Sequence, residues 1–270
     1  MLHVTPDGVR YHATRHGRGP AVLLLHGFTG SSATWAPLQE ALADACDMVA
    51  VDLLGHGESD APADPARYAA GRCAADLAGL LDVLGIEAAA VVGYSMGGRM
   101  ALRLALDQPR RVRALVLESA SPGIADVAGR AARVAADAAL ADDIERDGVA
   151  AFVARWERLP LWASQAALPA GVREALRAQR LRNDARGLAN SLRGAGAGAE
   201  PPALDMLGSL SMPTLLVAGA LDARYVAHAH AMAERIPGAR VAVVPDAGHA
   251  VHLERPAAFA ALVRAAVTPA

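Results

Sequence analysis

Ser95 stands among glycines in the run Gly-Tyr-Ser-Met-Gly-Gly at residues 93–98, after an apolar run and before a stretch of helical period. Glycines at these positions let the backbone turn sharply, so that the serine hydroxyl projects above the edge of a sheet. A serine hydroxyl is a weak nucleophile and a weak base by itself. It needs a histidine to accept its proton and an acid to orient that histidine. The run therefore predicts a catalytic serine whose partners come from other parts of the chain.

The acid and the histidine are expected at the ends of later strands, in the order serine, acid, histidine. Asp222 and His249 each follow a short apolar run, in this order. Asp246 is the competing acid, but it lies three residues before His249 in the same loop, where it is expected to shape the turn. The sequence therefore predicts a triad of Ser95, His249 and Asp222.

Negative charge that develops beside such a serine is stabilised by backbone N–H groups that point at it. One donor is expected from Met96, directly after the serine. The other is expected from the loop that starts with His26 and Gly27, where the small glycine lets the loop approach the site. The predicted oxyanion-hole donors are the N–H groups of Phe28 and Met96.

Arg99 follows Ser95 by four residues, so both side chains lie on one face of the predicted helix. A cation near a helix N-terminus opposes the helix dipole and is locally unfavourable. The position therefore suggests a compensating partner, which is either a carboxylate of a ligand or an acid of the chain itself.

These residues must be positioned by the elements around them. Short, nearly continuous apolar runs predict buried parallel strands, and stretches of helical period lie between them, for example at 69–84, 96–106 and 226–236. This alternation predicts an α/β fold with a mostly parallel, doubly wound sheet. Residues 4–14, with Pro-Asp-Gly at 6–8, predict an antiparallel start. The predicted parallel strands are Ala21–Leu25, Met48–Val51, Ala88–Val92, Val112–Leu117, Thr214–Ala218 and Arg240–Val244.

Residues 122–205 contain no strand-like run and interrupt this alternation. The glycine-rich segment 194–198 and the two prolines that follow predict a flexible return to the sheet. We expect an all-helical cap over 122–205, inserted into an α/β-hydrolase-type core made of residues 1–121 and 206–270. The helices predicted in the cap cover 124–141, 145–156, 171–182 and 184–192.

Composition excludes several classes of protein. The 270 residues are 53% hydrophobic and 20% charged, which excludes a disordered chain and suffices for one large domain with a cap. The net charge of −2 argues against nucleic acid or an anionic membrane as partner. All 26 basic residues are arginine, so neither a Schiff-base lysine nor a P-loop lysine exists.

The two cysteines are far apart and form no metal-binding pattern, so a disulfide framework and a zinc site are not expected. Residues 1–20 have no apolar stretch of a secretory signal, and no apolar run is long enough to span a bilayer. We therefore expect a cytoplasmic protein without membrane insertion that acts on a small molecule and needs no cofactor and no metal. Oligomeric state is not encoded in any of these patterns.

The serine motif, the two later triad residues and the His-Gly loop together resemble the α/β-hydrolase superfamily over the whole chain. The run Asp-Leu-Leu-Gly-His-Gly-Glu-Ser at 52–59 belongs to this resemblance, which implies a structural loop there and no catalytic role for His56. The superfamily includes esterases, lyases, dehalogenases and non-catalytic receptors. A serine in place of aspartate disfavours haloalkane dehalogenases and epoxide hydrolases.

A narrower resemblance rests on Arg99, on Ser-Pro-Gly-Ile at 121–124 and on the cap segments 130–133, 152–156 and 181–183. These are similar to the 2-succinyl-6-hydroxy-2,4-cyclohexadiene-1-carboxylate synthases of menaquinone biosynthesis. In that family three arginines hold the substrate's carboxylates, and a tyrosine and a tryptophan line the pocket. The matching substrate-binding positions are Tyr94, Arg99, Arg133, Trp156 and Arg182, with Arg130 as the alternative to Arg133 and Arg180 or Arg186 as alternatives to Arg182.

The resemblance implies a lyase that eliminates pyruvate from 2-succinyl-5-enolpyruvyl-6-hydroxy-3-cyclohexene-1-carboxylate. Ser95, activated by His249 and Asp222, would act as a general base on a ring C–H, while arginines fix the substrate's carboxylates. A serine carboxylesterase or a C–C bond hydrolase with the same triad is the alternative. A non-catalytic ligand-binding member of the fold would not need all three triad residues.

Overall fold

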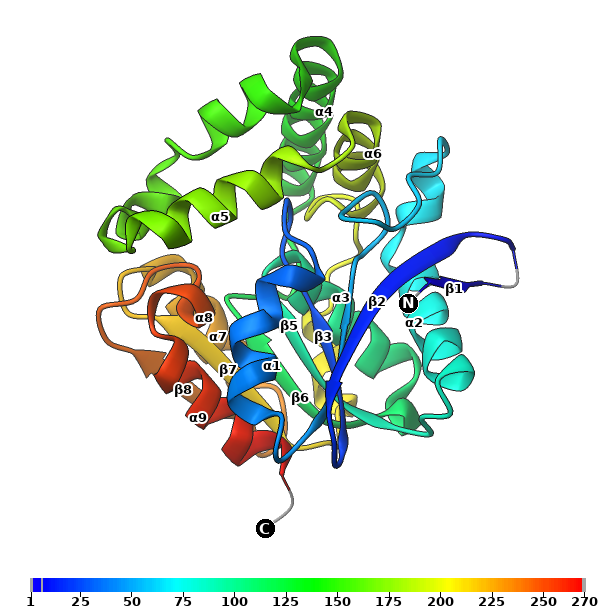
Figure 1. Cartoon of the computed structure of the whole chain (residues 1–270), viewed down its shortest axis with the longest axis vertical. Coiled ribbons are helices and arrows are strands. Elements are labelled where there is room, and N and C mark those ends of the chain that lie inside the picture. The colour runs from blue at the N-terminus through cyan, green and yellow to red at the C-terminus, as the bar shows by residue number, and fades with distance from the viewer. Residues whose placement is uncertain (1, 6, 269–270) are drawn as a thin grey trace.

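An eight-stranded sheet forms the centre of the protein in the computed structural model, which describes residues 2–5 and 7–268. The strand order is β1-β2-β4-β3-β5-β6-β7-β8, and all pairs from β4 to β8 are parallel (Figure 1). Every predicted parallel strand is present, and the α/β fold class is confirmed. The strands are β1 (Leu2–Val4), β2 (Arg10–Gly17), β3 (Ala21–Leu25), β4 (Asp47–Val51), β5 (Ala89–Tyr94), β6 (Val112–Glu118), β7 (Thr214–Gly219) and β8 (Arg240–Val244).

The antiparallel start is also confirmed. β1 pairs antiparallel with β2, and β2 pairs antiparallel with β4, where Gly17 lies opposite Asp47. Pro6 of the predicted turn lies outside the described residues. The N-terminal hairpin thereby extends the parallel sheet at the β4 side.

Helices cover both faces of the sheet, which is why the parallel strands can be apolar throughout. Leu77, Met100 and Met232 lie in the core on one face, whereas Trp35 and Phe259 lie in the core on the other. The helices of the α/β part are α1 (Ala36–Leu42), α2 (Ala70–Val83), α3 (Met96–Asp107), α7 (Ala223–Ala233), α8 (Val251–Glu254) and α9 (Pro256–Val267), with short 3-10 turns η1 (Ser32–Trp35), η2 (Pro65–Tyr68), η3 (Pro109–Arg111) and η5 (Leu204–Ser209).

Residues 122–205, for which we keep the name cap, consist mainly of helices and stand at the top of the molecule in Figure 1. Apolar side chains of α4 and α6, among them Ile144, Phe152 and Leu188, form a separate small core. Within the described part of the chain, no helix combines the length and the apolar character that a membrane span requires. The cap elements are α4 (Val127–Trp156), η4 (Pro160–Ala167), α5 (Ala170–Leu181) and α6 (Ala185–Ala195).

The cap differs from the prediction at two places. The expected interruption between residues 141 and 145 is wrong, because the chain is helical there and kinks instead at Gly148, whose φ is 81°. Ile144 is fully buried, so packing holds this part of α4 in the helix. η4 was not predicted, and it begins with Pro160, whose fixed φ suits the first position of a helix.

The glycines between α6 and the sheet allow close packing. A Cβ atom on Gly198 would lie 2.8 Å from the Arg130 carbonyl oxygen, and one on Gly196 would lie 2.5 Å from the Asp137 carboxylate. These distances are too short for any side chain, so both glycines are needed for contact with α4. The flexible return that the sequence predicts stays a prediction, and two of its glycines lie in close contact with their neighbours.

Candidate active site

Ser95 occupies the sharp turn between β5 and α3, with φ 51° and ψ −109°. The two glycines of the motif permit this turn. A Cβ on Gly97 would lie 2.2 Å from the Leu25 carbonyl oxygen, and one on Gly93 would lie 2.4 Å from the carbonyl oxygen of Gly97. The strained turn holds the serine at the carboxyl end of the sheet.

Ser95, His249 and Asp222 are hydrogen-bonded in series. His249 Nε2 lies 3.0 Å from Ser95 Oγ, and His249 Nδ1 lies 2.7 Å from Asp222 Oδ2. A carboxylate can only accept, so Nδ1 carries the proton and Nε2 is left to accept one from the hydroxyl. The arrangement can therefore convert the Ser95 hydroxyl into a base or a nucleophile.

Asp222 is also the N-cap of α7, because its Oδ1 accepts a hydrogen bond of 3.3 Å from the Tyr225 N–H. This cap starts α7 at Ala223, three residues before the predicted start. Asp246, the competing acid, is exposed, has φ 51° and lies 3.6 Å from Arg255. It therefore shapes the turn before the histidine, and Asp222 is the acid that meets His249.

The loop after β3 lies directly beside the serine. A Cβ on Gly27 would lie 2.6 Å from the Tyr94 ring and 3.4 Å from Ser95 Cβ. Among the described residues, the N–H groups of Phe28 and Met96 have no acceptor. Both donors are therefore free for an anionic oxygen of a ligand.

Two buried glutamates hold the turn that carries His249. Glu118, at the end of β6, accepts a hydrogen bond of 2.9 Å from the His252 N–H and lies 2.9 Å from His252 Nδ1. Glu254 accepts one of 2.7 Å from the Gly248 N–H. The sequence contains one sign of this support, because a second histidine, His252, follows His249 by three residues and therefore lies near the same turn. Over the described ranges, no group of three or more potential metal ligands is present.

Three aromatic rings surround the His249 ring. Their centroid distances to it are 4.5 Å for Tyr225, 5.4 Å for Trp162 and 5.5 Å for Tyr94. Burial raises the pKa of Tyr225, and the charges of Arg224, Arg99 and Arg133 oppose this shift. Trp162 and Tyr225 were not predicted, because no spacing in the sequence reveals which ring faces the triad.

A chain of rings links the cap to the loop that carries Phe28. The Trp156 centroid lies 5.5 Å from that of Phe28 and 5.6 Å from that of Trp162. Trp162 in turn contacts His249. Trp156, the last residue of α4, is thus brought close to the site as the resemblance implies.

Arg99 has a partner within the chain. Its guanidinium forms an ion pair with the carboxylate of Glu200 and donates a hydrogen bond of 2.8 Å to the Ala195 carbonyl oxygen. Both charged side chains are 11% exposed. Of the two partners that the sequence suggests for Arg99, this structure contains the internal acid.

Arg133 forms an ion pair with Asp137 one turn further along α4, at 2.8 Å, and its side chain is 43% exposed. It contacts no member of the triad, but its charge opposes the burial that raises the pKa of Tyr225, whose ring contacts His249. Arg133 is therefore near the site without a direct contact to it.

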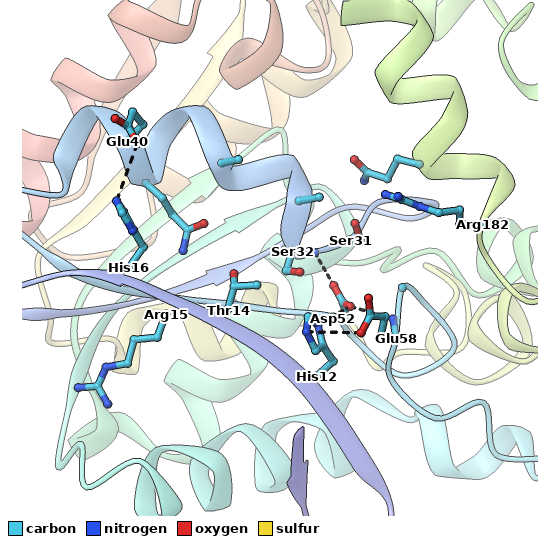
Figure 2. A pocket seen from close by; sticks show the side chains of 15 residues that line it. His12, Thr14, Arg15, His16, Ser31, Ser32, Glu40, Asp52, Glu58 and Arg182 are labelled. Atoms are coloured by element: carbon cyan, nitrogen blue, oxygen red, sulfur yellow. Dashed lines mark hydrogen bonds and ion pairs between the residues drawn. The ribbon is translucent and has the colours of Figure 1, made fainter. Parts of the chain in front are cut away.

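Arg182 lines a groove that contains no triad residue, and its role in substrate binding stays a prediction. Figure 2 shows its side chain at a groove that also contains His12, Asp52 and Glu58. The groove has a volume of about 800 Å³, and its lining includes none of the triad residues. The sequence match could not reveal this, because orientation around α5 decides it.

Arg180, an alternative to Arg182, is buried and lies with its guanidinium carbon 5.5 Å from the centre of the Trp162 ring. Its Nη1 donates to Glu157 at 3.2 Å, and its charge opposes the burial that raises the pKa of Tyr94. Side chains two apart on a helix point about 200° apart, so only one of residues 180 and 182 can face the site. Arg186, the other alternative, is exposed.

Four N–H donors of the cap are buried and have no acceptor among the described residues. Trp162 contacts both Trp156 and Arg180, and Gln165 lines one groove together with Trp162 and Arg180. A buried donor without an acceptor costs about 1–3 kcal/mol. The cluster is therefore suited to a ligand with several acceptor oxygens. The donors are Trp156 Nε1, Trp162 Nε1, Gln165 Nε2 and Arg180 Nε.

Comparisons with known proteins agree with this geometry. The model of the alpha/beta hydrolase fold family matches residues 20–256. A Bacillus subtilis (strain 168) relative named for 2-succinyl-6-hydroxy-2,4-cyclohexadiene-1-carboxylate synthase is 44% identical over 95% of this chain and 94% of its own length. The synthase of that name from Serratia proteamaculans (strain 568) is 33% identical over 91% of this chain and 92% of its own.

Comparison with a solved structure points to the same family. The structure titled MenH from S. aureus superposes with a TM-score of 0.89 at 32% identity and covers 94% of this chain and 96% of that one. The chain therefore belongs to the α/β-hydrolase fold family and, within it, to the family of 2-succinyl-6-hydroxy-2,4-cyclohexadiene-1-carboxylate synthases.

Proposed function

We propose that this chain is a carbon–oxygen lyase that eliminates pyruvate from 2-succinyl-5-enolpyruvyl-6-hydroxy-3-cyclohexene-1-carboxylate in menaquinone biosynthesis. The observation that carries the proposal is the set of arginine and unpartnered N–H donors around Trp162, whose ring contacts His249, in a chain 44% identical to a relative named for this synthase. A polar trianion is the ligand that such a cluster can satisfy. Because such a substrate does not partition into a bilayer, we propose a cytoplasmic location.

In the proposed reaction, Ser95 Oγ removes a proton from a ring carbon while His249 Nε2 accepts the hydroxyl proton. The electron pair of the broken C–H bond moves onto the succinyl carbonyl oxygen as an enolate, and its return breaks the C–O bond between the ring and the enolpyruvyl group. The leaving enolate takes the proton that His249 holds and tautomerises to pyruvate. The 3.0 Å contact between Oγ and Nε2 supports this role for the serine.

The N–H groups of Phe28 and Met96 would stabilise the enolate-like charge that develops on the succinyl carbonyl oxygen. Their lack of an acceptor among the described residues supports this assignment. Gly27 supports it as well, because its missing side chain lets the loop approach Ser95.

We assign the substrate's carboxylates to Arg99, Arg133 and Arg180, with Tyr94 and Trp156 as walls of the pocket. Arg180 replaces Arg182 because it is buried against Trp162, which touches His249. Guanidinium groups can hold carboxylates by paired hydrogen bonds and so fix the ring above Ser95.

The test is pyruvate release from the enolpyruvyl substrate, coupled to lactate dehydrogenase, with the spontaneous decay subtracted. Wild type should release pyruvate rapidly, and Ser95→Ala should lose about 10²–10⁴-fold in rate, which is the usual contribution of a general base. Arg99→Ala should raise KM or lower kcat sharply.

The alternative is a serine carboxylesterase or C–C bond hydrolase, which the same triad geometry could serve. Turnover of a small aryl ester without pyruvate release above background would support this alternative and overturn the lyase proposal. Both assays use the same preparations of wild type and Ser95→Ala. Activity of the wild type in one assay therefore shows that a negative result in the other is not due to inactive protein.

A further inference from the structure

Glu200 is a buried acid that the proposed reaction does not use. It is 9% exposed, and its carboxylate lies on the guanidinium of Arg99. Arg99 stands on α3 one turn after Ser95, and its charge opposes the burial that raises the pKa of Tyr225, whose ring contacts His249. The carboxylate of Glu200 therefore pairs with an arginine whose charge acts on a ring in contact with the triad histidine.

The segment that carries Glu200 is fixed in the fold. Ala203 N–H donates a hydrogen bond of 2.7 Å to the Pro122 carbonyl oxygen, and Pro201 follows Glu200 directly. At its other end, Gly198 lies against the backbone of α4. Glu200 is thus held in place by the packing of its segment as well as by Arg99.

The other charged and titratable groups that influence Glu200 are few. Burial raises the pKa of Glu200, and the charges of Arg99 and Arg103, both on α3, oppose this shift. From α2, the Cys73 thiol faces the same region, and the charge of Glu200 contributes to raising its pKa. Arg99 is the cation that directly contacts the Glu200 carboxylate among the described residues.

A ligand carboxylate on Arg99 would bring a second negative charge next to Glu200. Like charges that share one site cannot both stay ionised without a large cost, so one of them takes up a proton or moves away. Glu200 is buried and fixed, so it is the group on which this cost falls. Anion binding at Arg99 and the protonation of Glu200 must then favour each other.

We propose that Glu200 competes with the substrate's carboxylate for Arg99, so that it sets the affinity for anionic ligands and couples their binding to proton uptake. This inference rests on the proposed function in one respect, namely that a carboxylate of the substrate binds Arg99. In this inference the arginines provide the affinity for the substrate's carboxylates, and Glu200 limits that affinity.

The sign of the pH dependence follows from the coupling. A bound anion raises the pKa of Glu200 above its value in the free protein, so the complex binds more protons than the free protein between these two values. KM for the substrate and Kd for a simple dicarboxylate therefore rise with pH across this window. Glu200→Gln cannot ionise, so this dependence is absent from it.

The experiment measures succinate binding by calorimetry between pH 6 and 8.5 for wild type, Glu200→Gln, Arg99→Ala and the double variant. At pH 8, Glu200→Gln should bind succinate at least about fivefold more tightly than wild type, which is the low end of common coupling strengths. The gap should shrink as the pH falls. The charge-matched control is Glu58→Gln, whose side chain is 78% exposed and remote from Arg99, and it should bind like wild type.

Removing Arg99 identifies the site. In an Arg99→Ala background, Glu200→Gln should change the Kd for succinate by less than twofold, because the competition no longer exists. Weaker binding by Glu200→Gln than by wild type would overturn the proposal and make Glu200 an anchor that positions Arg99.

Wild type alone gives a further test, which stands even when a variant does not fold. Calorimetry in two buffers of different ionisation enthalpy should detect proton uptake on succinate binding, and no uptake would contradict the proposal. Succinate is bound and not turned over, so the two claims are tested separately. A failed pyruvate assay contradicts the lyase function but does not decide this inference. Pyruvate release without proton-linked succinate binding contradicts this inference and leaves the lyase function standing.

Discussion

Asp222 serves two elements at once, since one carboxylate oxygen accepts from His249 and the other caps α7. Asparagine is also a good N-cap, so Asp222→Asn should leave stability within about 1 kcal/mol of wild type. The amide cannot hold His249 in the required tautomer, so kcat should fall by about 10³–10⁴-fold. Steady-state kinetics and thermal unfolding of the same samples separate the two effects.

The matched control is Asp246→Asn, which changes the same chemical group three residues before His249. Its side chain is 81% exposed and makes only a 3.6 Å ion pair with Arg255, so kcat should stay within about twofold. A loss in Asp246→Asn as large as that in Asp222→Asn would contradict the assignment of the triad acid.

Arg180 and Arg182 offer a second comparison at the scale of single residues. Arg180 lies against Trp162, whereas Arg182 lies at the groove of Figure 2. Arg180→Gln should raise KM at least about tenfold, as expected for a lost charge-assisted hydrogen bond of about 1.5–3 kcal/mol. Arg182→Gln should stay within about twofold.

The measurement is KM for the enolpyruvyl substrate, with thermal unfolding as the control, because Arg180 also pairs with Glu157 inside the cap. Equal effects of the two substitutions on KM would remove Arg180 from the proposed pocket.

At the scale of elements, the kink of α4 at Gly148 determines how replacing this glycine changes the stability of the protein. Gly148 has φ 81°, a conformation that costs other residues about 1–2 kcal/mol, so Gly148→Ala should destabilise the protein by about that amount. Apart from the chain neighbours and the backbone of α4 itself, no described atom lies within 4 Å of the added Cβ, so this cost is one of backbone conformation.

Gly79, inside α2, is the matched control. Outside its chain neighbours and the backbone of α2, it also has no described atom within 4 Å of an added Cβ, and its φ is not positive. Alanine is the better helix former by about 0.8–1 kcal/mol, so Gly79→Ala should stabilise the protein. Denaturant unfolding measures both variants, and effects of the same sign would show that α4 runs straight through Gly148.

At the scale of the whole molecule, two buried histidines make the fold sensitive to acid. Burial lowers the pKa of His56 to about 3 and also lowers the pKa of His26. For His56, the unfolded chain therefore binds more protons than the folded one between about pH 6.5 and 3. Stability rises with pH in this window, so acidification below pH 6.5 should lower it by up to about 1.4 kcal/mol per pH unit through His56, and His26 contributes in the same direction.

Thermal unfolding between pH 7.5 and 5 tests this expectation. His56→Asn retains a donor for the Leu54 carbonyl oxygen, which His56 Nδ1 contacts at 3.0 Å, but has no ring to titrate. Its melting temperature should fall less steeply with acid than that of wild type. Identical slopes in the two proteins would show that His56 does not carry the acid sensitivity.

Local patterns in the sequence determined much of this protein. The six parallel strands, the turn at Ser95 and the order of Ser95, Asp222 and His249 were all predicted. Each follows from apolar runs and from glycine at fixed spacing, and these act over a few neighbouring residues. Parallel strands bring their carboxyl ends to one edge of the sheet, so residues far apart in the chain can be expected to meet there.

The tertiary structure alone decided what depends on orientation and on long-range packing. Rotation about α5 brings Arg180 and not Arg182 to Trp162, and the packing of the cap pairs Arg99 with Glu200 across 101 positions of the chain. The kink at Gly148 and the approach of Trp162 to His249 likewise depend on contacts between separate elements. Spacing along the chain identifies which residues lie on a helix, but only the packed neighbours determine which side of that helix meets the site.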